Sequence, residues 1–333
     1  MSSSPFCPGT LLAGRYRIVR SLGSGGMGHV YQVEDTALEN ELVALKLLKG
    51  EGPENTEMNA TARFRNEVLV TRRLAHANIV RTFDFGVVEG RRTFMTMEYV
   101  SGQTLEELIK EGTFFCAGIN ATLRVLIAVA EAVEHAHRKG VIHRDLKSAN
   151  VMLSDEGQVK VTDFGLAQVQ GFERNLTMKG ECVGTPTYMS PEQVQGAHVD
   201  HRCDIYSFGV IAYELVAGRV PFRDPSWMTL ASKIVNEPLP PITSSLYEIP
   251  PWYIAMVHKA AAKDPDDRFQ SFSELLTELR SHLPVTPAKS EPLAGGTVRI
   301  VIQRVENMWT PRIVAGAALA FLLLAAGVAG VLR

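Results

Sequence analysis

Hydrophobic and polar positions divide the chain into a first part with strand patterns and a second part with helical patterns. Short alternating or continuous apolar runs, each typical of a β-strand, occur at residues 15–21, 30–33, 42–48 and 94–100. One helical pattern, at residues 61–74, interrupts them. From residue 104 onward, apolar side chains recur at helical spacing, first over residues 104–111 and then over 121–138. The pattern therefore predicts an α+β chain whose helices continue to about residue 283.

The polar residues of greatest chemical interest lie between two apolar runs, at residues 141–142 and 151–153, which we expect to be short buried strands. A loop held at both ends positions its side chains well enough for catalysis. Asp145 can accept a proton from an attacking hydroxyl, and Lys147 can balance charge on a phosphoryl group. Asn150 can offer a carbonyl oxygen to a hard cation such as Mg²⁺. A solvated charged loop would contain the same residues, so this stretch alone leaves both interpretations open.

A second polar motif follows the next predicted strand, at residues 159–162. Asp163 places a carboxylate at the strand end, before Phe164 and Gly165, which suits a metal ligand. The sequences HRDLKSAN at 143–150 and DFG at 163–165 resemble the catalytic loop and the metal-binding loop of protein kinases. Either motif alone could arise by chance, but the two in this order strongly favour the kinase family.

The resemblance covers roughly residues 14–283 and implies a bilobal protein-kinase fold. Its small β-rich N-lobe would comprise residues 14–100, and its larger, mainly helical C-lobe residues 101–283. Lys147 resembles the Ser/Thr-specific rather than the tyrosine-specific members. The turn SPEQVQG, the short length and the apolar C-terminal stretch look most like the bacterial eukaryotic-like (Hanks-type) serine/threonine protein kinases. The activity implied is transfer of the ATP γ-phosphoryl group to Ser or Thr hydroxyls of proteins.

The resemblance also assigns roles to individual residues. Asp145 and Lys147 would be catalytic, and Asn150 and Asp163 would hold Mg²⁺, or Mn²⁺ in its place. The ATP-binding residues that it implies are Leu22, Gly23, Ser24, Gly25, Gly26, Met27, Gly28, Val30, Ala44, Lys46, Glu67, Met97, Glu98, Val100 and Met152.

The glycine-rich run and the adenine slot are weaker signals when taken alone. The pattern GxGxxG at 23–28 is followed by a predicted strand rather than by the helix of a dinucleotide site, so a phosphate-binding hairpin fits better. An ordinary Gly-rich turn would show the same letters. By resemblance Met97 is the gatekeeper, and the backbone of Glu98 and Val100 bonds adenine. The apolar residues of this slot are equally compatible with plain core.

Lys46 stands in an apolar run that reads Val-Ala-Leu-Lys where the family has VAIK. An ammonium in a buried strand is costly unless an anion pairs with it, and Asp163, a phosphate or a glutamate could do so. We assign Glu67, which lies on the apolar stripe of the helix predicted over 61–74. The alternative for Glu67 is an exposed helix charge paired with Arg63.

The segment between Asp163 and Glu192 has little periodicity, and a loop of this length in a compact domain is usually functional. Its end, GTPTYMSPE at 184–192, resembles the substrate-docking end of a kinase activation segment. By resemblance Thr185 contacts Asp145 and Lys147 at the substrate-docking site. We expect the kinase to autophosphorylate this segment, and Thr177 is the phosphorylation candidate because Arg144 could bind its phosphate. Thr177 could also be a mere exposed loop residue.

Two further polar residues have supporting roles in the family. Asp204 opens an apolar helix and would brace the backbone of the catalytic loop. Arg268 would pair with Glu192 of the PE motif.

Composition excludes several other classes of protein. The 333 residues have a net charge of −2, with 46% hydrophobic and 21% charged residues, so no basic field suggests nucleic-acid binding. The four cysteines are scattered, which predicts neither a zinc site nor a disulfide framework and suits a reducing compartment.

The two ends of the chain differ from its centre. Residues 1–13 are expected to be a disordered N-terminus without a secretory signal. Residues 284–311 are rich in Pro, Gly, Thr and Lys and read as a juxtamembrane linker. Residues 312–333 contain twenty uncharged residues, 313–332, which is the length that crosses a bilayer core of about 30 Å. Arginines before this span place the kinase domain in the cytoplasm and the chain in the inner or plasma membrane as a single-pass protein, in contact with lipid. Gly316 and Ala320 are a weak hint of a homodimer.

Two other functions remain open at this point. A catalytically inactive kinase fold could act as a membrane scaffold, but that hypothesis predicts a damaged motif and the sequence contains none. A small-molecule phosphotransferase is disfavoured by the complete substrate-docking stretch at 184–192.

Overall fold

The computed structural model describes residues 6–25, 28–48, 71–88, 92–112, 114, 118–164, 186–244 and 248–283. The chain divides into two compact units, Met1–Ile300 and Val301–Arg333, and all the described residues belong to the first. Several sequence predictions lie outside the described residues and are not tested: Gly26, Met27, Glu67, Thr177, Thr185, the linker at 284–311 and the membrane span at 313–332.

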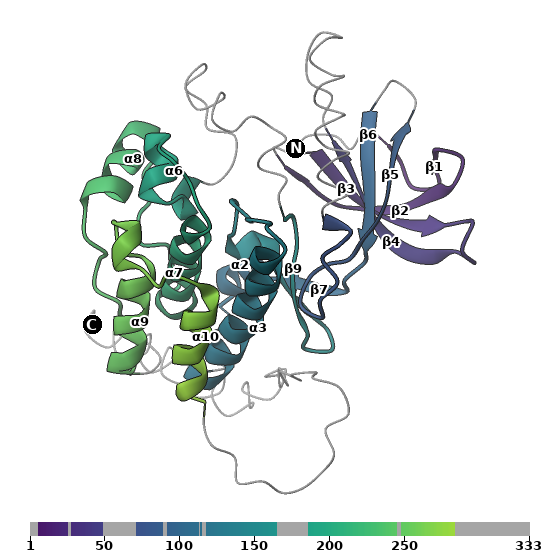
Figure 1. The fold of residues 1–333 in the computed structure, drawn as a ribbon. Coiled ribbons are helices and arrows are strands. Elements are labelled where there is room, and N and C mark those ends of the chain that lie inside the picture. Colours follow the sequence, from purple (N-terminus) through teal and green to yellow (C-terminus); the bar gives the residue numbers. More distant parts are fainter. Residues whose placement is uncertain are drawn as a thin grey trace, which may run out of the picture. The chain divides into compact units, whose positions relative to one another are not determined.

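A six-stranded antiparallel sheet forms the N-terminal part of the fold (Figure 1). Four of its strands match the strand patterns of the sequence, whereas the strands at 11–12 and 82–88 were not predicted, and the first of them lies in the stretch expected to be disordered. Its strands in spatial order are β1 (Leu11–Leu12), β2 (Tyr16–Gly25), β3 (Gly28–Asp35), β4 (Glu41–Leu48), β6 (Arg92–Glu98) and β5 (Thr82–Val88). At the start of β2 alternate residues are buried, and Tyr16 and Ile18 pack with Tyr31 of β3 in one hydrophobic core. In this register Lys46 of β4 lies opposite Val30 of β3 and Met95 of β6.

Gly28 must be a glycine because β3 and β4 approach each other closely at this point. Its φ is +147°, and a Cβ atom there would lie 2.0 Å from the carbonyl oxygen of Leu47. Gly28 pairs with Gly25 between the antiparallel strands β2 and β3, so the glycine-rich run leads into a strand rather than into a helix.

A second, three-stranded antiparallel sheet carries the polar loops. It consists of β7 (Gly102–Thr104), β8 (Val151–Ser154) and β9 (Val159–Val161), in that order. The strands predicted at 151–153 and 159–162 are confirmed within one residue. The strand predicted at 141–142 is wrong: Val141 is buried, but the backbone N–H groups just after it bond a carboxylate instead of a neighbouring strand.

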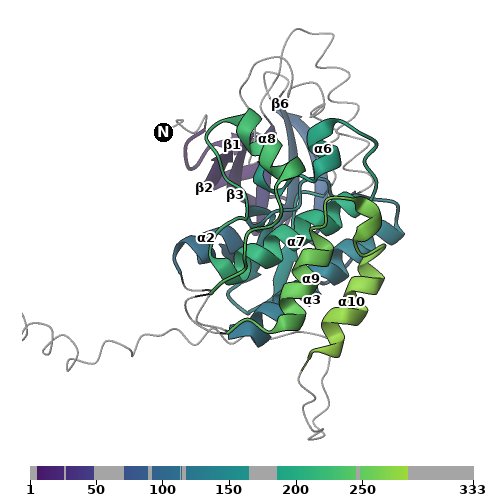
Figure 2. The ribbon, with the colours of Figure 1, turned by 90° about the vertical axis from the view of Figure 1, so that its left-hand side faces the viewer.

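The α-helices of the described ranges are labelled in Figure 2. They are α2 (Leu105–Lys110), α3 (Gly118–Arg138), α6 (Pro191–Gln195), α7 (Arg202–Ala217), α8 (Trp227–Asn236), α9 (Pro251–Ala260) and α10 (Phe272–Ser281). The predictions at 104–111 and 121–138 are confirmed, and a capping box of Thr104 and Glu107 starts α2.

α7 is buried almost all round, because apolar residues occupy every face and other helices surround it. α9 packs against α7 so closely that a Cβ atom on Gly209 would lie 2.9 Å from the backbone nitrogen of Ala261. α3 packs against both α7 and α10. This helical core fixes the start of α7, and with it Asp204, beneath the catalytic loop.

None of the helices in the described ranges is both long and apolar enough to cross a membrane.

Candidate active site

The loop at 143–150 is held from below by a carboxylate. Asp204, fully buried at the start of α7, accepts hydrogen bonds from the backbone N–H groups of His143 and Arg144, both at 2.8 Å. His137 Nε2 lies 2.7 Å from Asp204 Oδ2, the same oxygen that accepts from His143. Burial raises the pKa of Asp204, but the hydrogen bond and charge of His137, with His143, outweigh this effect and lower the pKa. Asp204 therefore stays ionised, and its predicted bracing role is confirmed by these contacts.

Two residues of the site have strained backbones. Arg144 and Asp163 both have φ of +64°, a region that non-glycine residues rarely occupy. Such strain persists only where surrounding contacts impose it, and it is concentrated at functional sites. Here His143 joins the two loops, because its ring contacts Phe164 at 4.6 Å and its Nε2 lies 3.0 Å from the carbonyl oxygen of Thr162.

The predicted catalytic residues contact one another. Lys147 Nζ donates to Asp145 Oδ2 at 2.7 Å, and Asn150 Nδ2 donates to the Asp145 carbonyl oxygen at 2.8 Å. Asn150 is buried in a short 3₁₀ turn, Ser148–Asn150, and this bond directs its amide nitrogen toward Asp145. Its carbonyl oxygen is thereby left available as a ligand for a hard cation.

Lys46 and Asp163 connect the two sheets. Lys46 Nζ lies 2.8 Å from Asp163 Oδ1, and the side chain of Lys46 is only 6% exposed. Burial raises the pKa of Asp163, but the charge and hydrogen bond of Lys46 outweigh this effect, so the pKa is lowered and the carboxylate is ionised. Asp163 is thus a partner of Lys46, one of the three anions that the sequence allowed. The assignment of Glu67 stays a prediction.

The residue types fit a magnesium ion bound together with a nucleotide. Asp163 supplies a carboxylate and Asn150 an amide oxygen, which are hard ligands. The described ranges contain no group of three or more His, Cys, Asp or Glu that could hold a metal by themselves. Mg²⁺ usually takes one or two protein carboxylates and completes its coordination with phosphates and water, so this ligand set fits Mg²⁺ with ATP.

The predicted adenine slot brings apolar residues of three strands together. Ala44 of β4 lies opposite Met97 of β6, and both are buried in one small cluster against which Val30 and Val100 pack. Leu22, in β2, is 37% exposed. Gly23 and Gly25 have open space where a side chain would start, which leaves their backbone accessible to a phosphate. Met152, on β8, is half-buried.

The end of the activation segment is anchored by two buried networks. Tyr188 donates to Glu214 Oε2 at 2.6 Å and lies 2.8 Å from Ser148 Oγ of the catalytic loop. Burial raises the pKa of Tyr188 and of Glu214. Arg268 donates twice to Glu192, both at 2.7 Å, which confirms the pairing expected from the sequence. The Tyr188–Glu214 bond was missed, and its only sequence signal was a second acid, Glu214, near the end of the apolar helix that Asp204 opens.

Comparisons with known proteins agree with this geometry. The family model of the protein kinase domain matches residues 16–280. The chain belongs to the protein kinase family. A probable serine/threonine-protein kinase of Clostridium acetobutylicum is 38% identical over 271 residues, and the probable serine/threonine-protein kinase PknB of Lactococcus lactis is also 38% identical over 271 residues. Each match covers 81% of this kinase.

The fold of the kinase has close counterparts among solved structures. The crystal structure of the Mycobacterium tuberculosis PknI kinase domain matches with a TM-score of 0.62 and 29% identity, over 83% of this chain and 99% of that chain. The bilobal fold expected from the sequence is therefore confirmed. The kinase spans about 40% of the length of the curated relatives, since the two matches above cover 40% and 42% of those proteins.

Proposed function

We propose that the chain is an ATP-dependent serine/threonine protein kinase. The observation that carries the proposal is the ion pair between Lys46 and Asp163, 2.8 Å apart, beside a loop in which Asp145, Lys147 and Asn150 contact one another. These residues come from separate elements of the chain, and a structural role alone gives no reason for so many charges to converge.

Each residue has a role in an in-line transfer of the γ-phosphoryl group. Bound Mg-ATP supplies the phosphoryl group and neutralises its charge. Asn150 and Asp163 would hold the metal, and Lys46 would bind phosphate oxygens while remaining close to Asp163. Asp145 orients the acceptor hydroxyl and takes its proton, and Lys147 steadies the Asp145 carboxylate and balances charge on the transferred group.

The specificity for Ser and Thr is tested with matched acceptor peptides. The full chain is incubated with Mg-ATP and three peptides that differ only in a central Ser, Thr or Tyr, and transfer of labelled phosphate is measured. We expect transfer to Ser and Thr, and at most a small fraction of that rate to Tyr. Equal or faster transfer to Tyr would contradict the proposed specificity.

We also propose that the kinase phosphorylates itself at Thr177 and that Arg144 binds the new phosphate. Support comes from the position of Arg144 next to Asp145, where a bound phosphate would order the segment that docks substrate. Mass spectrometry of the active protein tests this proposal. A protein with full activity and no phosphate between residues 165 and 185 would refute it.

A single-pass membrane location remains a proposal that rests on the sequence of residues 313–332. Lipid contact, a cytoplasmic kinase domain and a homodimer through Gly316 and Ala320 belong to the same proposal. Cell fractionation of the full chain and of a chain ending at residue 311 tests it. The full chain should stay in the membrane fraction after alkaline extraction, and the shortened chain should not.

A further inference from the structure

A second concave site lies at the end of β6, the strand that carries predicted adenine contacts. A groove of about 500 Å³ is formed by the segment after residue 73, the start of β5, the end of β6 and β9. We call it the rear groove. Leu74, Ile79 and Phe83 give it an apolar floor, and His76, Arg81, Lys160 and Glu98 give it a polar rim. Of these residues only Glu98 belongs to the ATP-binding set.

Glu98 is the only acid among the described residues that line the rear groove, and it is already neutralised. Lys160 Nζ lies 2.7 Å from Glu98 Oε1, and the backbone N–H of Arg81 donates to Glu98 Oε2 at 3.2 Å. The guanidinium of Arg81 is exposed and makes no ion pair with any residue in the described ranges. Arg72 and Arg73, just before Leu74, are exposed as well. Among the described residues that line the groove, the unbalanced charge is therefore positive, although the whole chain has a net charge of −2.

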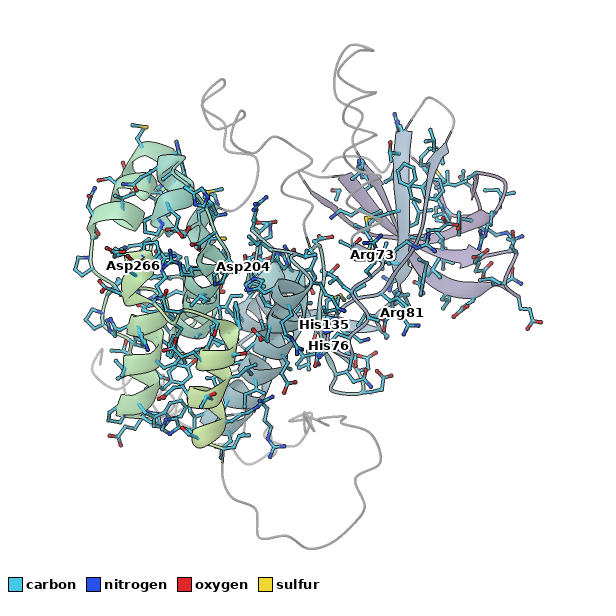
Figure 3. All side chains as sticks on the ribbon, viewed as in Figure 1. Arg73, His76, Arg81, His135, Asp204 and Asp266 are labelled. Carbon is cyan, nitrogen blue, oxygen red and sulfur yellow. The ribbon has the colours of Figure 1, made fainter. Side chains whose placement is uncertain are left out.

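Two histidines, His76 and His135, lie beside the groove. The ring centroids of His76 and His135 lie 5.1 Å apart. Figure 3 labels these two residues and Arg81. Burial and neighbouring positive charges lower the pKa of both histidines, so both are mainly neutral at pH 7. An anion in the groove would contact Arg81 and would favour protonation of His76. A cation would be repelled by Arg81.

The shape and the surface chemistry select an extended peptide rather than a small ion. A volume of 500 Å³ falls in the range of ligand pockets, and the apolar floor would contribute nothing to binding of a bare phosphate. β5 begins at the groove and is the last strand of its sheet, so an extended segment could lie along it. Charge complementarity then requires acidic residues next to an apolar side chain.

We propose that the rear groove binds an acidic, extended segment of a partner protein, with an apolar side chain on Leu74, Ile79 and Phe83 and a carboxylate on Arg81. The site is separate from the catalytic loop. Binding there does not depend on whether the chain transfers phosphate.

A fluorescence-anisotropy titration of the full chain tests the proposal. The probe is the fluorescein-labelled peptide Glu-Glu-Leu-Phe-Glu-Glu, and the comparison peptides are Gln-Gln-Leu-Phe-Gln-Gln and Glu-Glu-Ser-Ser-Glu-Glu. We expect the acidic, apolar peptide to bind about tenfold more tightly than either, and its binding to weaken with salt. Equal affinity for the three peptides would overturn the proposal.

Variants locate the bound peptide. Arg81→Glu should weaken binding about tenfold, and Arg81→Gln should have a smaller effect of the same sign. Arg223→Glu, the same charge change at an exposed arginine between α7 and α8, should leave binding unchanged. The thermal unfolding of each variant shows that it is folded. Unchanged binding to Arg81→Glu would refute the site.

Two competition experiments complete the test. Saturating Mg-ATP should not displace the peptide, because displacement would place it in the catalytic cleft. Vesicles with phosphatidylserine should not displace it either. Displacement by vesicles would identify the groove as a lipid-facing surface instead, and either displacement would overturn the proposal.

Discussion

At the scale of single residues, the chemistry rests on charges that are buried only because they are paired. Lys46 is 5% exposed, and Asp163 is the anion that the structure places beside it. Removing one partner of such a pair leaves an uncompensated buried charge. Lys46 is therefore the residue whose replacement should lower the rate of phosphate transfer most clearly.

Replacing Lys46 by methionine keeps most of the side-chain volume and removes the charge. We expect kcat for phosphate transfer to fall by about a hundredfold or more, because a preorganised cation no longer faces the phosphates. A coupled assay of ADP release measures the rate, and thermal unfolding reports whether the variant is folded. Lys259→Met, at an exposed lysine of α9, is the control and should keep full activity. A Lys46→Met protein with normal kcat would contradict the assigned role.

The histidine pair makes stability depend on pH in a definite direction. Since burial and neighbouring positive charges, Arg138 and Lys139 among them, lower the pKa of His76 and His135 in the folded chain, the unfolded chain binds more protons below about pH 6.5. Glu131 acts against this shift at His76 but does not reverse it. Stability should therefore fall as pH drops through 6.5 toward the folded pKa values.

The test compares the free energy of unfolding at pH 7.5 and pH 5.5. His135→Tyr removes one of the two titrating rings and the repulsion between them, so the variant should lose less stability on acidification than the original chain. His258→Tyr, at an exposed histidine of α9, should lose as much as the original chain. If His135→Tyr showed the same loss, the pH dependence would have to come from other groups.

At the scale of elements, two buried ionic contacts hold the active-site segments in place. Asp204 ties α7 to the catalytic loop. Arg268 and Glu192, both almost fully buried, tie the segment after α9 to the start of α6. Neither contact involves reacting atoms, so both should act on stability and on the position of the loops.

Arg268→Met should lower the free energy of unfolding by about 3–5 kcal/mol, because Glu192 is left buried without a cation. Urea unfolding measures the loss. The double variant Arg268→Met/Glu192→Leu should recover much of it, since no unpaired charge remains. Lys259→Met, which breaks the exposed pair with Glu274, should cost about 1 kcal/mol or less. Equal losses for the buried and the exposed pair would refute this account.

The sequence predicted most elements because periodicity is a local property. The runs at 42–48 and 121–138 became β4 and α3 with small shifts at their ends. The strand expected at 141–142 failed because an apolar pair indicates burial but not a strand partner. The Tyr188–Glu214 bond and the His76–His135 pair join residues that are far apart in the chain, and no local pattern announces such contacts.

At the scale of the whole molecule, β9 and Asp163 connect the two described sheets. Val80 donates its N–H to the carbonyl oxygen of Val161, and Lys160 pairs with Glu98 of β6. Asp163, two residues after β9, pairs with Lys46 of β4. The strand that positions the metal ligand thus also contacts the strand predicted to bind adenine, so a change at either sheet should affect the site.

The central claim is that the convergent residues transfer phosphate to protein hydroxyls, and one measurement tests it most directly. The full chain and its Asp145→Ala variant are incubated with γ-labelled ATP, Mg²⁺ and an acceptor protein, and the labelled amino acids are identified. Asp267→Ala, at an exposed aspartate, is the control. The account predicts labelled phosphoserine and phosphothreonine with the original chain and the control, and at least about a hundredfold less with Asp145→Ala. Equal labelling by Asp145→Ala, or no labelling by the original chain, would contradict it.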